Sequence, residues 1–242
     1  MTWAPQLEAV ARIASSEERI AQYTRLLEHA LHDTPSASLP SLVRTYVDGA
    51  VLDPVNTTGA GLLVGRHMLA HLATQLAAAH IPANILCTIV SDTLATCEAS
   101  SIMGDDELGP WRVLLAEQYA SLSRWRDAAQ ALQSITPHAA RRIPQLSFAQ
   151  LCVRVVELWL HDLPSHVAEA EQAIKRANSA ILDERDNKAL VHELWSYHAR
   201  VLAIQHRFME AAARYMDLPH ADMYAAVYAI ISPPSAQRTS ML

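Results

Sequence analysis

The 242-residue chain contains only six glycines, and none of them follows Gly109. Loops that hold phosphate on backbone N–H groups need glycine, and no glycine-rich loop of that kind is present. Long runs that alternate apolar and polar residues, which are typical of half-buried strands, are also missing. The sequence therefore predicts an all-α protein without a phosphate-binding loop.

Charge is scarce and nearly balanced, because 19 Lys and Arg residues stand against 25 Asp and Glu residues, for a formal net charge of −6. This balance argues against a dominant nucleic-acid surface, which would be basic. The most apolar region, residues 62–76, is interrupted by Arg66, His67, His71 and Gln75, so we do not expect it to span a membrane. The first fourteen residues contain no long apolar run, so no signal peptide is expected.

Cysteine is also rare. Cys87, Cys97 and Cys152 are odd in number and form no C-x-x-C pair, which is typical of thiols in a reducing compartment. We expect these thiols to be small apolar groups in the core. The glycosylation sequon at Asn56 then has no role, because such sequons are used only in secreted chains.

Two sets of side chains are candidates for metal binding. His67 and His71 lie one helical turn apart and could present two imidazoles to a metal ion, but no third ligand accompanies them. Asp105, Asp106 and Glu107 fall in a predicted loop but lack the spaced oxygen ligands of a calcium loop. A structural or solvated role is favoured for both sets, and we expect no metal, no cofactor and no catalytic residue.

The chain does contain a repeated helical hairpin. Three copies share an aromatic residue followed by alanines on the second helix. In the first and third copies the aromatic residues, Trp125 and Phe208, are 83 residues apart; in the second copy, midway between them, Trp159 lies on the first helix. The period of 41–42 residues indicates stacked helical hairpins and exceeds the ~34 of tetratricopeptide repeats. The residues expected to pack the repeats are Tyr119, Trp125, Ala128, Ala129, Trp159, Ala168, Trp195, Phe208, Ala211, Ala212 and Tyr215.

The predicted architecture is a curved superhelical stack of antiparallel helix pairs, tetratricopeptide-like, with one domain over residues 1–232 and a frayed tail over 233–242. The aromatic residue of each copy should plug the corner, and small alanines should let the helix axes approach to ~8–10 Å. A helix over residues 222–231 begins a fourth pair, and Pro110 is expected to open the helix before the first corner. The last apolar face of such an array lacks a cap.

Four arginines gather near the first corner and the loop after it. Arg124, Arg126, Arg141 and Arg142 could bind an acidic partner, and the alternative is a solvated rim.

The repeats resemble the family of subunit four of the COP-nine signalosome, the complex that removes a ubiquitin-like modifier from cullins. The segment HARVLAIQHRFMEAAARYMDL, from His198 to Leu218, is similar to the family pattern A-R-V-L-x-x-x-x-(K/R)-F-x-E-A-A-x-R-Y-x-E-L. The corner from Trp125 to Leu132 resembles D-W-R-x-A-A-x-x-L, with Arg124 in the acidic place. Residues 236–242 resemble A-x-x-x-x-Q-R-S-R-M-L, from which Thr239 departs.

The resemblance implies a non-catalytic N-terminal arm of this PCI-domain family, ending before its winged-helix module. Its implied partners are other signalosome subunits and cullin–RING ligases, without nucleic acid, membrane or small-molecule substrate, in the cytoplasm and the nucleus. The proteasome-lid counterpart shares the same plan and stays an alternative. Two further alternatives are a tetratricopeptide co-chaperone, against which the period counts, and a metal-dependent enzyme using His67 and His71.

Overall fold

In the computed structural model, every described element is helical. The prediction of an all-α fold is therefore confirmed, since the described residues form α-helices and short 3₁₀- and π-helical segments and no strand. The structure describes residues 3–143, 146–184, 187–219 and 221–233. Residues 234–242 of the expected frayed tail lie outside the described residues.

The contacts within the chain group it into two compact units. The first comprises Met1–Arg124 and Ser134–Pro144, and the second comprises Trp125–Gln133 and Gln145–Leu242. The division falls inside the first repeat copy, because its second helix belongs to the second unit. The single domain over residues 1–232 and its superhelical course therefore stay predictions, and each unit is described by itself.

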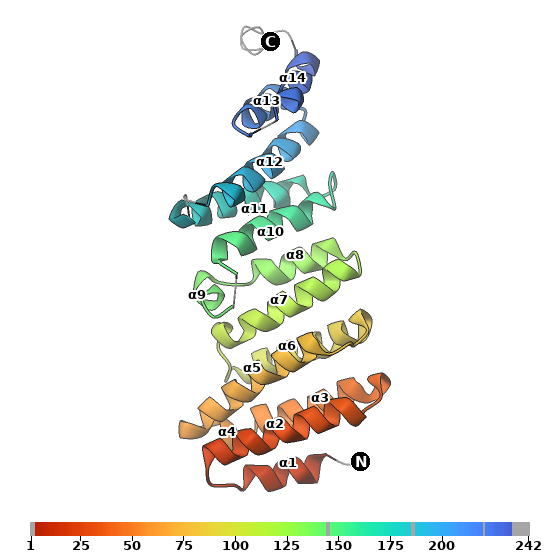
Figure 1. Ribbon diagram of the computed structural model, residues 1–242, viewed down its shortest axis with the longest axis vertical. Helices are drawn as coiled ribbons and strands as arrows, with labels where there is room; N and C mark the ends of the chain where they lie inside the picture. The colour runs from red at the N-terminus through yellow and green to blue at the C-terminus, as the bar shows by residue number, and fades with distance from the viewer. Residues whose placement is uncertain (1–2, 144–145, 185–186, 220, 234–242) are drawn as a thin grey trace. The chain divides into compact units, whose positions relative to one another are not determined.

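The first unit is a stack of helices around large, fully buried side chains such as Tyr23, Met68 and Leu72. The sequence predicts that Pro110 opens the helix before the first corner. This prediction is wrong, because Pro110 lies inside that helix. The helices of this unit (Figure 1) are α1 Ala4–Ala11, α2 Ser16–Asp33, α3 Leu39–Tyr46, α4 Pro54–Thr57, α5 Leu62–Ala78, α6 Ala83–Ser100, α7 Asp105–Ser121 and α9 Pro137–Ala140.

A buried polar network lies in the first unit beside the π-helix Val47–Val51. The Asn56 side-chain amide donates hydrogen bonds to the Ala50 carbonyl at 3.0 Å and to the Tyr23 hydroxyl at 3.2 Å. The Tyr46 hydroxyl donates to the Tyr23 carbonyl at 3.3 Å. Because buried polar groups are costly unless hydrogen-bonded, Asn56 serves the packing of this unit, and its side chain is fully shielded from glycosylation.

The second unit confirms the repeat period. The second helix of each hairpin begins at Trp125, Val167 and Phe208, which are 42 and 41 residues apart (167 − 125 and 208 − 167). Successive helices from α10 to α14 pack on one another (Figure 1). The helices of this unit are α8 Trp125–Gln133, α10 Phe148–Leu160, α11 Val167–Ala180, α12 Lys188–Ile204, α13 Phe208–Met216 and α14 Asp222–Ile231.

The first and third copies also share the backbone geometry of the corner. Ser123 and His206, 83 residues apart, both have positive φ, at 58° and 60°. The next residue in each copy donates its N–H to a carbonyl five positions earlier, from Arg124 at 2.8 Å and from Arg207 at 2.9 Å. These bonds satisfy carbonyls left open at the end of the first helix. The sequence repeat therefore encodes a repeated helix stop.

The alanines of the second helices form a buried seam. Ala128 and Ala129 on α8, and Ala211 and Ala212 on α13, are completely shielded from solvent. Alanine permits close approach of two helices because it projects only a methyl group. The seam thus lets α8 pack closely on α10, and α13 on α12 and α14.

The middle copy differs from the expectation at one residue. Ala168 on α11 is exposed, whereas Ala170 and Ala177 of this helix are completely buried. Ala170 follows Ala128 by 42 residues and precedes Ala211 by 41, so it holds the seam position. Two residues rotate the side chain by about 200° around a helix, so Ala168 points to the opposite side.

The aromatic residues at the corners are not the buried plugs that the sequence predicts. Trp125 and Phe208 are only half-buried. Trp125 stacks on His161 with ring centroids 4.3 Å apart, and Phe208 stacks on Tyr228 at 6.3 Å. They cover the ends of the pairs from outside. Of the other residues expected to pack the repeats, Trp159 and Tyr215 are buried, and Tyr119 and Trp195 are half-buried.

A pair of substitutions tests the seam. We expect Ala170→Leu to lower the free energy of unfolding by about 1–3 kcal/mol, because a larger side chain overpacks the crossing. Ala168→Leu, two residues away on the exposed side, should change it by less than about 0.5 kcal/mol. Urea unfolding of both variants measures the difference, and equal stability would contradict the register.

The three thiols are buried, and burial raises the pKa of each above its ordinary value. The pKa reaches about 11 for Cys97 and for Cys152. At pH 8 only about one molecule in a thousand should carry either thiolate, which is the reactive form. We therefore expect slow labelling by Ellman's reagent in the native protein and three fast equivalents in urea. Fast labelling of a native thiol would contradict core placement.

Candidate interaction surface

Helix α14 presents a large apolar face to solvent. Its side chains Met223 and Ile230 are 70% and 56% exposed, and Tyr224, Val227 and Ile231 are each about half exposed or more. Met223, Val227 and Ile230 follow one another by four and three residues, so they lie on one side of the helix. We call these five residues the α14 face. Exposed apolar patches of this kind mark sites of protein–protein contact.

The opposite side of α14 is fixed on α13. Ala225 and Ala229 are buried, and a ladder of stacked rings crosses the two helices. The Tyr215 and Tyr228 rings lie 5.5 Å apart and nearly parallel, and the Tyr224 ring also stacks on Tyr215 at 5.5 Å. Aromatic stacking of this geometry stabilises packing beyond the area it buries. The α14 face is therefore held on a rigid support.

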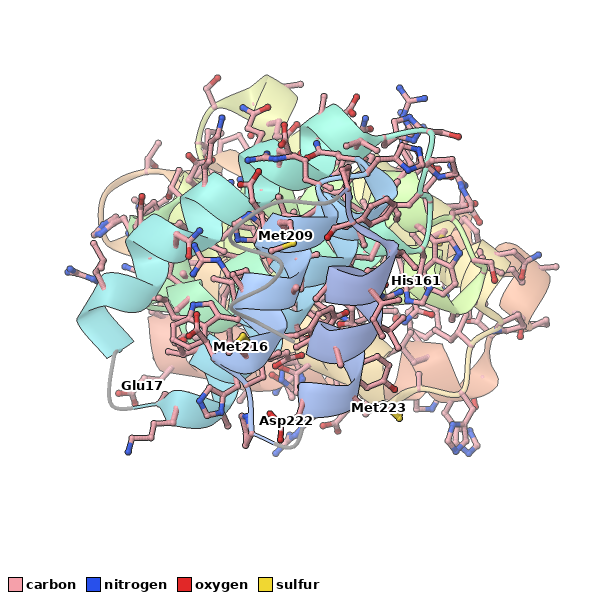
Figure 2. The ribbon with its side chains drawn as sticks, turned by 90° about the horizontal axis from the view of Figure 1, so that it is seen from above. Glu17, His161, Met209, Met216, Asp222 and Met223 are labelled. Carbon is pink, nitrogen blue, oxygen red and sulfur yellow. The ribbon has the colours of Figure 1, made fainter. Side chains whose placement is uncertain are left out.

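Three methionine side chains lie on α13 and α14. Figure 2 looks onto these helices and labels Met209 and Met216 on α13 and Met223 on α14. Met216 is 54% exposed, and Met209 accepts a hydrogen bond from the Ser232 hydroxyl at 2.9 Å. Methionine side chains are flexible and polarizable, which suits them to surfaces that adapt to a partner.

A second cluster of functional groups lies in the first unit, at the start of α7. Asp105, Asp106 and Glu107 form the first helical turn, so the expected loop is wrong. Glu107 is nearly buried: one carboxylate oxygen accepts from the Gly104 N–H at 3.0 Å, and the other lies 3.2 Å from Arg66 and 3.0 Å from Arg142. These contacts satisfy the hydrogen-bonding capacity of the Glu107 carboxylate. Its negative charge is also stabilised by the positive end of the helix dipole at the start of α7.

The other two carboxylates of this turn are paired as well. Asp105 accepts a hydrogen bond from Arg112 at 3.2 Å, and Asp106 lies 3.1 Å from His138 and 3.6 Å from Arg142. Asp106 and Glu107 therefore hold α7 against neighbouring segments, whereas Asp105 pairs with Arg112 of the same helix.

The four arginines that the sequence singles out have different surroundings. Arg142 is engaged by Glu107 and Asp106, and the Arg124 guanidinium lies over the Tyr119 ring at 4.4 Å. Arg126 and Arg141 are exposed and belong to different units. Partner binding by these arginines stays a prediction.

Within the described residues, no group of three His, Cys, Asp or Glu side chains is placed to hold a metal ion. His67 is exposed and His71 is half-buried on α5. In the same part of the chain, every helix is too short or too polar to traverse a bilayer.

The start of α7 differs from the prediction, although the sequence contains a signal for it. Acidic residues in the first turn are a signal for a helix start, but Pro110 was given more weight as the opening residue. The stretch DMYAAVYAII is apolar on all sides, which is typical of a helix covered on all sides. Because several apolar side chains of α14 are exposed, this helix is not covered on all sides as its composition predicts.

Sequence comparison confirms the expected resemblance. The chain is 28% identical over 257 residues to "COP9 signalosome complex subunit 4" of Caenorhabditis elegans, covering 97% of this chain and 61% of the relative. It is 25% identical over 210 residues to proteins of the same name from Arabidopsis thaliana and Drosophila melanogaster, covering 86% and 84% of this chain. No family model matches the chain.

The chain spans only part of these relatives. It covers 61% of the length of the C. elegans protein and 49% and 48% of the other two. The function of the full-length relatives is therefore a proposal for this chain.

The ion-pair cluster of α7 gives a matched pair of variants. We expect Glu107→Ala to lower the free energy of unfolding by about 1–2 kcal/mol, because it removes a cap and the carboxylate on which two partly exposed arginines converge. Asp105→Ala should cost less than about 1 kcal/mol, because its side chain is 54% exposed. Chemical denaturation at neutral pH measures both. If the two losses were equal, Glu107 would not be the centre of the cluster.

Proposed function

We propose that the chain is a non-catalytic scaffold subunit of a COP9 signalosome. Its helical stack would help the complex recognise cullin–RING ligases from which the ubiquitin-like modifier Nedd is removed, in the cytoplasm and the nucleus. The similarity to subunit 4 over 97% of the chain is the observation that carries this proposal.

The α14 face supports a role in assembly. Each helix from α10 to α13 is covered by the helix that follows it in the stack, and α14 shows outward the kind of apolar face that the others bury. A helix of another subunit would suit this face, because an amphipathic helix can lay its apolar stripe on such a surface. The α14 face would then be an assembly interface.

Two observations count against the alternatives of a proteasome-lid subunit and a tetratricopeptide co-chaperone. All three relatives bear the name of a signalosome subunit, which favours the signalosome over the proteasome lid. The confirmed period of 41–42 residues counts against a tetratricopeptide co-chaperone.

The proposal is tested by co-purification. A tagged chain is expressed with the other signalosome subunits and isolated, and the bound proteins are identified by mass spectrometry. We expect signalosome subunits to co-purify and the double variant Val227→Asp/Ile230→Asp to lose them, because buried unpaired carboxylates are costly. The cullin-deneddylation rate of the isolated complex should fall in parallel.

Leu63→Asp provides the control, because Leu63 is an isolated side chain on α5 that is 70% exposed. It should leave co-purification unchanged. Recovery of proteasome-lid subunits or of chaperones would assign the chain to one of the alternatives. Full recovery of the signalosome with the double variant would remove the α14 face as the interface.

A further inference from the structure

Two exposed carboxylates lie where α13 ends and α14 begins. Asp217 is the residue that follows α13, and Asp222 is the first residue of α14. Both are exposed, and so are the flanking Met216 and Met223, with 54% and 70% of their surface. Figure 2 shows Asp222 and Met223 at the same end of α14. The two carboxylates therefore lie at the end of the hairpin where the α14 face begins.

The negative charge at this end has no partner among the described residues. Neither Asp217 nor Asp222 forms an ion pair there, whereas Arg207 and Glu210 at the other end of α13 pair with each other. Asp222 is also the only charged residue of α14. The α14 face is thus apolar along its length and acidic at its start.

Asp217 is placed against the preference of its own helix. It caps the C-terminal end of α13, where the helix dipole disfavours a negative charge. Its carboxylate accepts no hydrogen bond from another described residue. The packing of α13 therefore gives no reason for an acidic residue at this position, whereas a cation on a partner does.

The helix order of the stack indicates how a partner lies on α14. Helices α10 and α12 each pack against the helix that follows, α11 and α13, and a short connection makes the two helices of each pair antiparallel. Helix α14 follows α13 as α12 follows α11, and it is the last helix of the described residues. A partner helix in the place that α11 and α13 take in their pairs would run antiparallel to α14.

An antiparallel helix brings its C-terminal end to the start of α14. The dipole of any helix favours cations in its last turn, so Lys or Arg there stabilises the partner helix and also meets the two carboxylates. We propose that the α14 face binds, in antiparallel orientation, an amphipathic helix of another subunit whose last turn carries basic residues beside Asp217 and Asp222. That partner is a subunit of the assembly proposed above, so this binding mode rests on the proposed function. The apolar stripe supplies contact area, and the basic turn sets the direction.

The probe is a pair of fluorescein-labelled peptides of about 14 residues, or four helical turns, held helical by the same side-chain staple. Both carry a stripe of leucines on one face and glutamine and alanine elsewhere. The first peptide has two lysines in its last turn, and the second has them in its first turn. Fluorescence anisotropy with the full chain measures both affinities. We expect the first peptide to bind at least about fivefold more tightly at low salt, and the difference to vanish at high salt, which screens charges.

Asp217→Lys is the decisive variant, because a cation at the C-terminal end of α13 favours that helix and folding should be retained. We expect its affinity for the first peptide to fall at least about fivefold, with little change for the second. Glu8→Lys makes the same change of charge at an exposed position of α1 in the first unit, and it should leave both affinities unchanged. Melting curves followed by circular dichroism check that each variant folds.

Several outcomes would overturn the proposal. They are no binding of either peptide, equal affinity of the chain for the two peptides, or wild-type affinity of the Asp217→Lys variant. A homodimer in analytical ultracentrifugation that Val227→Asp/Ile230→Asp abolishes would also overturn it, because the face would then belong to a second copy of the chain.

Co-purification separates this binding mode from the proposed function. If the wild-type chain recovers no signalosome subunits, the proposed function is contradicted. If the wild type recovers them and Asp217→Lys recovers them undiminished, only the basic end of the partner helix is contradicted.

Discussion

The second unit depends on the absence of side-chain bulk where its helices cross. Ala128, Ala129, Ala170, Ala211 and Ala212 have no exposed surface, and each occupies the same part of its hairpin. A methyl group is large enough to exclude water and small enough to let two backbones approach. Because neither helix of a pair shields its own apolar side, the pairs gain stability only by stacking. The aromatic residues at the corners stack on the pair ends and remain half-buried.

The sequence predicts the period of this arrangement well, because the period is fixed by repeated local signals. The starts of α8, α11 and α13 and the positive-φ stop residues Ser123 and His206 all follow it. The register of the middle copy was wrong by two residues, since α11 offers alanines on several sides and only tertiary packing selects Ala170. The start of α7 was missed because two valid signals compete there, and the ion pairs of Glu107 come from segments distant in the sequence.

The candidate binding surface arises from the same helical packing. The α14 face is the outer side of a helix whose inner side carries alanines. Its apolar character was foreseeable from an all-round apolar helix. Which of its side chains stay exposed was not, because exposure depends on how neighbouring helices pack, and no spacing in the sequence reports that.

The central claim is that the two helices of a hairpin support one another through the alanine seam. Native-state hydrogen exchange of α12 and α13 at increasing urea concentration tests it most directly, because it measures the opening free energy of each helix. If the seam couples the two helices of the pair, the amide protons around Ala199 on α12 and Ala211 on α13 should converge on one opening free energy. Exchange of α13 through an independent opening of much lower free energy, with α12 still closed, would contradict the account.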